Sequence, residues 1–356
     1  MVSSSQPTKK KFLNSINYFR GIAIILIVLG HCQGLGGLDT STNAEKLLYS
    51  LISNGSVYFV FISGFLYNHI FYPRFEYKKF MKKKTQFVLL PYLLCSLVPI
   101  LLTVFVGDGG KFLPGSLREQ PFLAIIWFLV TGRINFAYWY IPMVMILFAI
   151  SPVINWIIRS NKILLAIAFL LPISLIVHRP SDGINPLHSV VYFLPVYLIG
   201  IWSSINNKKI YAYLKDNKKK AVIVLLAIAL SLIQIFVLHS SGNFTKEFWS
   251  ITVPDVNLLQ KILLCFLLMS ILDHYENTDI SSMKKTAETS FAIYFIHPFL
   301  INAIASIAKK LNLDLSYQGN FFTLVLATFL IVIISMAIAY GIKAVLKKNS
   351  RYLIGW

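Results

Sequence analysis

Long apolar runs separated by short polar segments dominate this chain. Runs of about 20 residues, the length needed to cross a bilayer as a helix, occur at ten places: 16–35, 46–71, 85–106, 138–158, 163–178, 187–205, 221–239, 256–273, 288–308 and 320–346. We therefore predict an all-α membrane protein with about ten transmembrane helices. The apolar stretch from Pro121 to Val130 is too short to span, which indicates an interfacial or re-entrant piece.

Composition and loop length support one membrane-embedded domain. Hydrophobic residues make up 56% of the chain and charged residues 13%, whereas about 25% of an ordinary soluble domain is charged. The mean hydropathy is +0.68. The longest connection, Gly107 to Ala137, is shorter than the usual domain minimum of about 50 residues. We expect a single membrane domain over residues 1–356, surrounded by lipid and without a separate soluble domain.

The basic residues are distributed unevenly between the two sets of helix ends. One set carries 23 of them: Lys9 to Lys11, those from Arg74 to Lys84, Arg159, Lys162, those from Lys208 to Lys220, Lys284, Lys285 and those from Lys343 to Arg351. The other set carries eight: Lys46, Lys111, Arg118, Arg133, Arg179, Lys246, Lys309 and Lys310. The positive-inside rule then predicts a multi-pass plasma-membrane protein with both termini cytoplasmic. The net charge of +19 is scattered over short loops, so we expect no nucleic-acid partner.

The first apolar run contains two ionisable residues, Arg20 and His31, eleven positions apart. Eleven residues of helix turn about 20° beyond three full turns and rise about 16 Å, so both side chains lie on one face. Ionisable residues inside a membrane usually face a bundle interior or a water-filled cavity and mark a functional site. The alternative interpretation is that the Arg20 side chain extends to the lipid headgroups and that His31 is a buried residue hydrogen-bonded to a helix carbonyl.

A second polar stripe lies in the run 288–308. Ser290, Tyr294 and His297 follow i, i+4, i+7 spacing and therefore share one helix face, beside Pro298. This helix runs in the same direction as the first, so His297 is expected at a depth similar to that of His31, where it orients an acceptor or donates a proton. The alternative is an interhelical hydrogen bond that only positions the helix.

Further candidates carry weaker signals. Ser63, beside Gly64 in the second run, is a candidate for lining the substrate channel, although small residues at this place also allow close packing of helices. Tyr92, Trp139 and Tyr140 are expected to line a substrate channel, unless they are interfacial anchors. Lys82, Lys83 and Lys84 are candidates for binding donor phosphates, although the preference for basic residues at cytoplasmic helix ends already explains their presence. The three cysteines show no metal-binding spacing, so the sequence predicts no metal site.

Several blocks in order along the chain resemble the acyltransferase-3 family of membrane O-acyltransferases. The first block is Asn17 to Gly21 followed by His31, which resembles the Arg-ten-residues-His signature of that family. The remaining blocks are Phe59 to Leu66, Lys82 to Lys84 with Leu90 to Tyr92, Trp139 to Pro142 with Ile150 to Pro152, and Ser290 to Pro298. Each block alone is weak, but together they cover nearly the whole chain.

The resemblance implies a ten-helix enzyme that uses cytoplasmic acyl-CoA, usually acetyl-CoA, as donor substrate, with no permanently bound cofactor. The acceptor is expected to be a hydroxyl of a glycan or lipid-linked glycan of the cell envelope. Arg20 would then pair with a coenzyme A phosphate, and His31, whose unperturbed pKa is about 6.5, would act as the general base. In this family the basic loop often carries paired arginines, whereas lysines stand here and make point-charge contacts.

Two questions stay open at this level. We expect no fused hydrolase-like domain, in which case either the membrane domain acylates the final acceptor or a separate extracytoplasmic partner completes the transfer. The rival function is a polysaccharide exporter or flippase, which needs no acyl donor. A receptor or regulatory module explains ten spans poorly and gives the Arg20 and His31 stripe no role. The oligomeric state cannot be derived from the sequence.

Overall fold

The computed structural model describes residues 13–107, 113–250, 252–312 and 319–356. The lysines at 9 to 11 and at 111, which enter the orientation argument, lie outside these ranges. The described chain is almost entirely helical, with one pair of two-residue strands, β1 (Arg179–Pro180) and β2 (Thr245–Lys246), in parallel.

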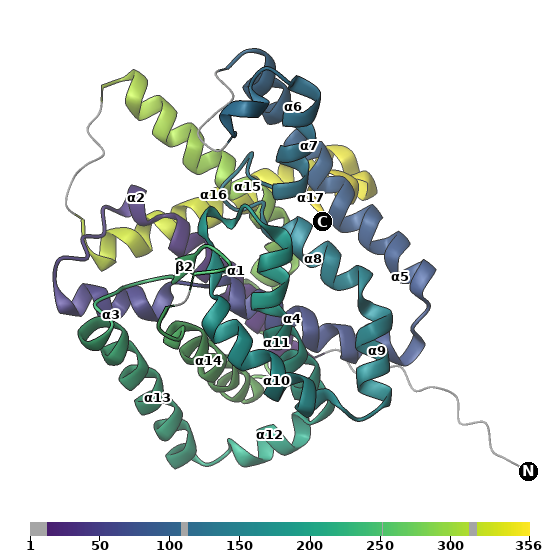
Figure 1. The fold of residues 1–356 in the computed structure, drawn as a ribbon, viewed down its shortest axis with the longest axis vertical. Coiled ribbons are helices and arrows are strands. Elements are labelled where there is room, and N and C mark those ends of the chain that lie inside the picture. Colours follow the sequence, from purple (N-terminus) through teal and green to yellow (C-terminus); the bar gives the residue numbers. More distant parts are fainter. Residues whose placement is uncertain (1–12, 108–112, 251, 313–318) are drawn as a thin grey trace, which may run out of the picture.

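The helices follow one another in the order shown in Figure 1. The first half contains α1 (Asn14–His31), α2 (Gln33–Gly36), α3 (Asn43–Ile52), α4 (Ser56–Leu66), η1 (Tyr67–Phe71), η2 (Tyr72–Arg74), α5 (Tyr77–Lys84), η3 (Thr85–Leu89), α6 (Leu90–Phe105), η4 (Gly115–Leu117), α7 (Pro121–Thr131), α8 (Tyr140–Ala149), α9 (Ser151–Arg159) and α10 (Ile163–Val177). The second half contains η5 (Ser181–Gly183), α11 (Pro186–Ile205), α12 (Asn207–Tyr213), α13 (Asn217–Leu232), η6 (Ile233–Val237), α14 (Val256–Asp273), α15 (Ser281–Lys310), α16 (Phe321–Leu346), η7 (Lys347–Asn349) and α17 (Ser350–Ile354).

Within the described ranges, seven helices are long and apolar enough to cross a membrane, or eight if the bent pair α8 and α9 forms one span. This confirms a multi-pass helical membrane protein but not the ten spans predicted. Two of the predicted spans do not meet the criterion: α1, whose Arg20 and His31 lower its hydropathy, and α10, which has 15 residues.

Two helices predicted to be continuous are broken. The run 46–71 is interrupted between α3 and α4 at Asn54, which has φ 57°, a left-handed conformation that ends a helix, although Asn43–Arg74 still counts as one candidate span. The run 138–158 bends by 52° between α8 and α9, where Pro152 stands at the start of the second helix. Proline lacks the amide hydrogen that would continue the ladder, and its ring clashes with the preceding turn.

The core of the bundle lies where α1, α4, α11, α14 and α15 meet, near the middle of Figure 1. In the most apolar stretch of the central span Pro186–Ile205, 78% of the residues are buried and the mean hydropathy is 1.4. In that of Asn217–Val237, at the edge of the bundle, 22% are buried and the mean hydropathy is 2.5. The outer helices are thus the more apolar ones, as expected if lipid covers their exposed faces.

Small residues allow the closest helix contact. A Cβ atom on Gly64 of α4 would overlap the carbonyl of Tyr197 in α11, and one on Gly200 of α11 would overlap the carbonyl of Phe61 in α4. The two helices therefore touch backbone to backbone, which is the usual reason for glycine at membrane helix interfaces.

Candidate active site

Arg20 is held in place by two hydrogen bonds from its guanidinium. Its Nε donates to the carbonyl oxygen of Ala287 in α15 at 3.0 Å, and its Nη2 donates to Oδ1 of Asn17, one turn earlier in α1, at 3.0 Å. The spacing of Asn17 and Arg20 therefore has a physical reason, since residues three apart are neighbours on a helix surface. These contacts fix the planar guanidinium at the wall of a large cavity.

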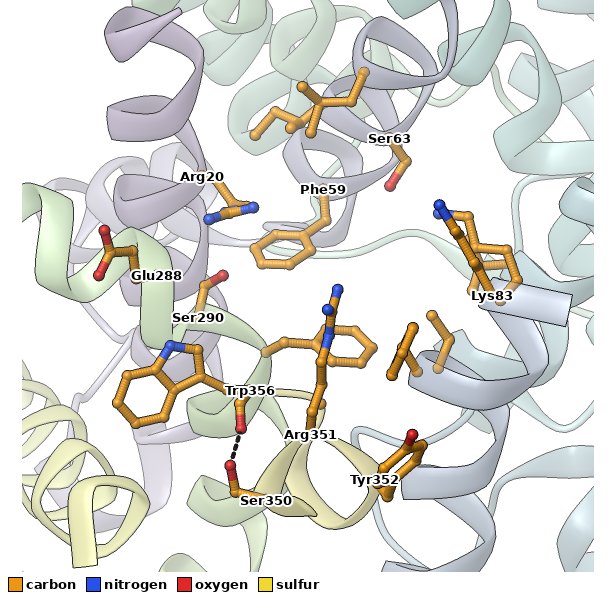
Figure 2. Close-up of a pocket in the computed structure, with 18 of the residues that line it drawn as sticks. Arg20, Phe59, Ser63, Lys83, Glu288, Ser290, Ser350, Arg351, Tyr352 and Trp356 are labelled. Carbon is orange, nitrogen blue, oxygen red and sulfur yellow. Dashed lines mark hydrogen bonds between the residues drawn. The ribbon is translucent and has the colours of Figure 1, made fainter. Parts of the chain in front are cut away.

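This cavity, which we call the vestibule, has a volume of about 850 Å³. Figure 2 shows Arg20, Lys83 and Arg351 around it, with Glu288 to one side. Its described basic lining residues are Arg20, Lys83, Lys84, Lys343, Lys347, Lys348 and Arg351. Glu288 is the acidic residue among the described lining residues, so the vestibule has a strong positive charge. Its volume is within the range of about 300–1,000 Å³ that is typical of small-molecule sites.

A second, much smaller cavity lies beside His31. Its volume is about 10 Å³, roughly that of one water molecule. Its walls are Ile27, His31, Ser56, Phe59, Ala137, Trp139, Tyr140 and Tyr294. Phe59 and Tyr140 also line the vestibule, so these two side chains separate the two spaces.

The rings of His31 and His297 stack beside this small cavity. Their centroids are 5.6 Å apart with an interplanar angle of 29°, and Phe136 packs 4.7 Å from the His31 ring. His297 is fully buried. Its Nδ1 lies 2.9 Å from the carbonyl oxygen of Ile293, and because a carbonyl only accepts, Nδ1 carries the proton.

The other nitrogen of His297, Nε2, is buried and has no hydrogen-bond partner among the described residues. In the neutral ring Nε2 then presents a lone pair, so it accepts a hydrogen bond. This geometry favours orientation of a hydroxyl over the donation of a proton, the two roles that the sequence left open for His297. A buried polar atom without a partner is costly and needs an explanation, and a catalytic role is one of those that apply to a buried histidine nitrogen.

Two arginines that sequence reasoning treated only as loop charges lie within electrostatic range of the His31 ring. The guanidinium of Arg179 lies over the Trp139 ring at 4.5 Å, and its Nη1 donates to Oδ1 of Asn54 at 3.4 Å. Arg133 lies 3.9 Å from a carboxylate oxygen of Asp182. Burial lowers the pKa of Arg133 to about 10, although Asp182 opposes this shift, so Arg133 is charged at neutral pH.

The structure distributes the other sequence candidates unevenly. Ser63 and Ser290 line the vestibule, Trp139 and Tyr294 line the small cavity, and Tyr140 lines both. Ser63 Oγ and Tyr140 Oη are hydrogen-bonded at 3.2 Å.

Tyr92 and Lys82 do not lie in either cavity. Tyr92 donates from its hydroxyl to the carbonyl oxygen of Leu129 at 2.8 Å and so ties α6 to α7. Lys82 is absent from the described lining of both cavities, whereas Lys83 and Lys84 line the vestibule. The ammonium of Lys84 lies 4.3 Å from the Phe148 ring centroid, an attractive cation–π contact.

Sequence reasoning missed several residues of this region: Phe136, Arg133, Arg179, Glu288, Tyr352 and Trp356. Phe59 was noted only as the first residue of a motif. The basic residues from Lys343 to Arg351 were used as a topology signal, although their clustering at one helix end was the available indication of a site.

The chain is an almost entirely helical bundle with several apolar spans, and its basic cavity shares two wall residues with the small cavity beside the stacked His31 and His297 rings. These features define a multi-pass membrane protein with a candidate internal reaction site. A family model described as "Acyltransferase domain", that of the acyltransferase-3 family, matches residues 13–340. The chain therefore belongs to the acyltransferase-3 family and is a membrane acyltransferase. No curated protein and no solved structure matches it.

Proposed function

We propose that this protein transfers an acyl group, usually acetyl, from cytoplasmic acyl-CoA to a hydroxyl of a cell-surface or envelope glycan. One observation carries the proposal: Phe59 and Tyr140 form a common wall between the basic vestibule and the cavity at His31. A donor bound in the vestibule needs to pass only these two side chains to bring its thioester to the histidine pair.

The vestibule suits the charged end of the donor. Coenzyme A carries several phosphates, and Arg20 offers a planar group that pairs with phosphate through two parallel hydrogen bonds. Arg20 and His31 are separated by about 16 Å of helix, a distance comparable to the length of a pantetheine arm. With phosphate near Arg20, the arm therefore extends towards Phe59 and Tyr140, and its thioester reaches the His31 cavity.

The two histidines then act on the acceptor hydroxyl. His31 removes the hydroxyl proton as the oxygen attacks the thioester carbonyl carbon. The new C–O bond forms, the C–S bond breaks, and the coenzyme A thiolate leaves and takes up a proton. His297 accepts a hydrogen bond through Nε2 and holds the hydroxyl or the His31 ring in orientation. Phe136 packs against the His31 ring and Tyr294 against the His297 ring, and these aromatic side chains limit the access of bulk water and so the hydrolysis of the thioester.

The orientation predicted from the basic residues would place each substrate on its own side of the membrane. With both termini cytoplasmic, the vestibule opens inward and the acceptor approaches His31 from outside, past Trp139, Arg179 and Arg133. Aromatic rings and arginines are suitable contacts for a sugar or lipid-linked sugar. In this account the membrane domain itself acylates the acceptor, and a separate extracytoplasmic partner is not required.

A genetic experiment distinguishes acyl transfer from polysaccharide export. In the native host, His31→Ala should leave the amount of surface glycan unchanged while its alkali-labile ester groups disappear. Surface polymer would be quantified by sugar analysis and esters by mass spectrometry before and after mild alkali. Loss of the polymer itself from the cell surface, with normal amounts inside, would support the exporter and contradict the acyltransferase proposal.

A further inference from the structure

The segment of residues 343–356, which we call the C-terminal segment, forms one wall of the vestibule. It lies beyond the residues that match the family model, 13–340. It contributes Lys343, Lys347, Lys348 and Arg351 to the basic lining, together with Tyr352 and Trp356. More than half of the basic lining residues thus come from outside the matched region.

Packing and hydrogen bonds fix the end of this segment against α15 and α16. Ser350 Oγ donates to the carbonyl oxygen of Trp356 at 2.5 Å. The Trp356 ring packs edge-on against Tyr340 with centroids 4.9 Å apart, and the Lys343 ammonium lies 3.5 Å from its centroid. Ile354 is buried in a small apolar cluster with α15 and α16. The wall is therefore built by specific contacts.

Gly355 makes this arrangement possible. Its φ is +73°, which favours glycine, and a Cβ atom at this position would overlap the ring of Phe291 in the vestibule wall. The chain can turn here and approach Phe291 closely only because there is no side chain.

The same segment also contacts the opposite side of the vestibule, at η3. The Arg351 guanidinium lies 3.9 Å above the Phe87 ring. The Tyr352 ring packs 5.7 Å from that ring at 31°, and Gln86 Nε2 donates to the Tyr352 hydroxyl at 3.2 Å. The segment thus joins η3 to α15 and α16, and Figure 2 shows Arg351 pointing into the space between Arg20 and Lys83.

The chemistry of this wall matches a polyphosphorylated nucleotide. Lysines and an arginine bind phosphate, and the partly exposed aromatic rings next to them offer stacking surfaces for a base. Membrane orientation alone would explain basic residues on a helix end, but it requires neither a hollow between them nor aromatic rings lining it. An anionic lipid headgroup shares the phosphate chemistry but has no base to stack.

We propose that the C-terminal segment is the nucleotide-binding wall of the donor site, with Arg351 binding the phosphates and Tyr352 and Trp356 flanking the adenine. This inference rests on the proposed use of acyl-CoA. It assigns recognition of the nucleotide end to residues 343–356, while Arg20 lies deeper, nearer the start of the pantetheine arm.

The test compares donors that differ only at the nucleotide end. The purified full chain in neutral phosphatidylcholine nanodiscs would be titrated by calorimetry with acetyl-CoA and with S-acetylpantetheine, which lacks the nucleotide. Arg351→Ala should weaken acetyl-CoA binding about 10-fold or more and leave S-acetylpantetheine binding unchanged. Arg351→Lys should restore part of the loss. Gly355→Ala, which displaces the wall without removing charge, should give the same donor-selective loss, and the double variant Lys208→Ala/Lys209→Ala, in α12, serves as the control.

Each outcome decides the question. If the wild type binds acetyl-CoA but Arg351→Ala leaves this binding unchanged, or weakens binding of both donors equally, the nucleotide wall is contradicted and the proposed function still stands. Wild-type protein that binds neither donor removes both proposals. Repeating the titration in phosphatidylglycerol nanodiscs tests whether the segment binds lipid headgroups instead. An effect of Arg351→Ala on acetyl-CoA binding that is absent in neutral lipid and present only in anionic lipid would assign the segment to headgroups and overturn the inference.

Discussion

The His31 and His297 rings stack with centroids 5.6 Å apart, although 266 positions separate them in the sequence. Among the described residues, a backbone carbonyl fixes a ring nitrogen of His297 but none of His31. The Nδ1 proton of His297 is committed to Ile293, and this leaves Nε2 as an acceptor. The pair is therefore asymmetric: His297 is fixed in orientation, whereas His31 borders the small cavity.

Replacement of His297 should reduce turnover while the donor still binds. His297→Ala removes the acceptor Nε2 that orients the hydroxyl or the His31 ring, so we expect a rate of acyl transfer about 100-fold lower with an unchanged Kd for acetyl-CoA. The exposed His239 provides the matched control through His239→Ala. Activity of His297→Ala within threefold of wild type would assign this residue to packing alone.

Arg20 should act on donor binding. Arg20→Ala removes a group that pairs with a donor phosphate, at an expected cost of about 1.5–3 kcal/mol, or roughly 10- to 150-fold in affinity. The affinity for acetyl-CoA would be measured by calorimetry on folded protein, with Arg118→Ala, at an exposed loop position, as the control. Unchanged affinity of Arg20→Ala for acetyl-CoA would show that the phosphate site does not include Arg20.

Phe59 should limit the length of the acyl chain. The cavity at His31 has a volume of only about 10 Å³, and Phe59 forms part of its wall towards the vestibule. Phe59→Ala enlarges this space, so the preference for acetyl-CoA over butyryl-CoA in kcat/KM should fall about 10-fold or more, since each methylene is worth about 1–3 kcal/mol. Phe169→Ala, on the exposed face of α10, is the control. An unchanged preference would show that another surface sets the chain length.

Gly64 should be required for stability and not for chemistry. A methyl group there overlaps the Tyr197 carbonyl in α11, so Gly64→Ala forces α4 and α11 apart at a cost of about 1–3 kcal/mol. Thermal unfolding in detergent measures the effect as a lower Tm. Gly341→Ala is the matched control, because a Cβ atom at Gly341 meets nothing within 4 Å. Equal Tm values for the two variants would contradict the close helix contact.

The sequence indicated the features that depend on local periodicity. Arg20 and His31 were found from helical spacing, and His297 from the same rule in a later helix; the structure brings the two histidines together. The predicted runs also match observed helices closely, as in Pro186–Ile205 against the prediction 187–205. Length and hydropathy suffice for such elements because a membrane helix satisfies its own backbone hydrogen bonds.

Contacts between distant segments could not be obtained in this way. Arg133 lies in the connection between α7 and α8, and Arg179 lies in β1 between α10 and α11. Their approach to His31 depends on how these helices pack, which no local sequence pattern predicts. The left-handed turn at Asn54 was missed as well, since it lies within an apolar run; there the Asn54 side chain donates to the Tyr192 hydroxyl at 3.1 Å.

The most direct test of the account follows the acyl group itself. Purified protein in lipid would be incubated with radiolabelled acetyl-CoA and a panel of glycan acceptors, and alkali-labile label on the acceptor would be counted for wild type and His31→Ala. We predict label transfer by the wild type and a rate about 100-fold lower in His31→Ala, with donor affinity preserved. Full turnover in His31→Ala, with folding and membrane insertion intact, would contradict the assignment of His31 as the general base.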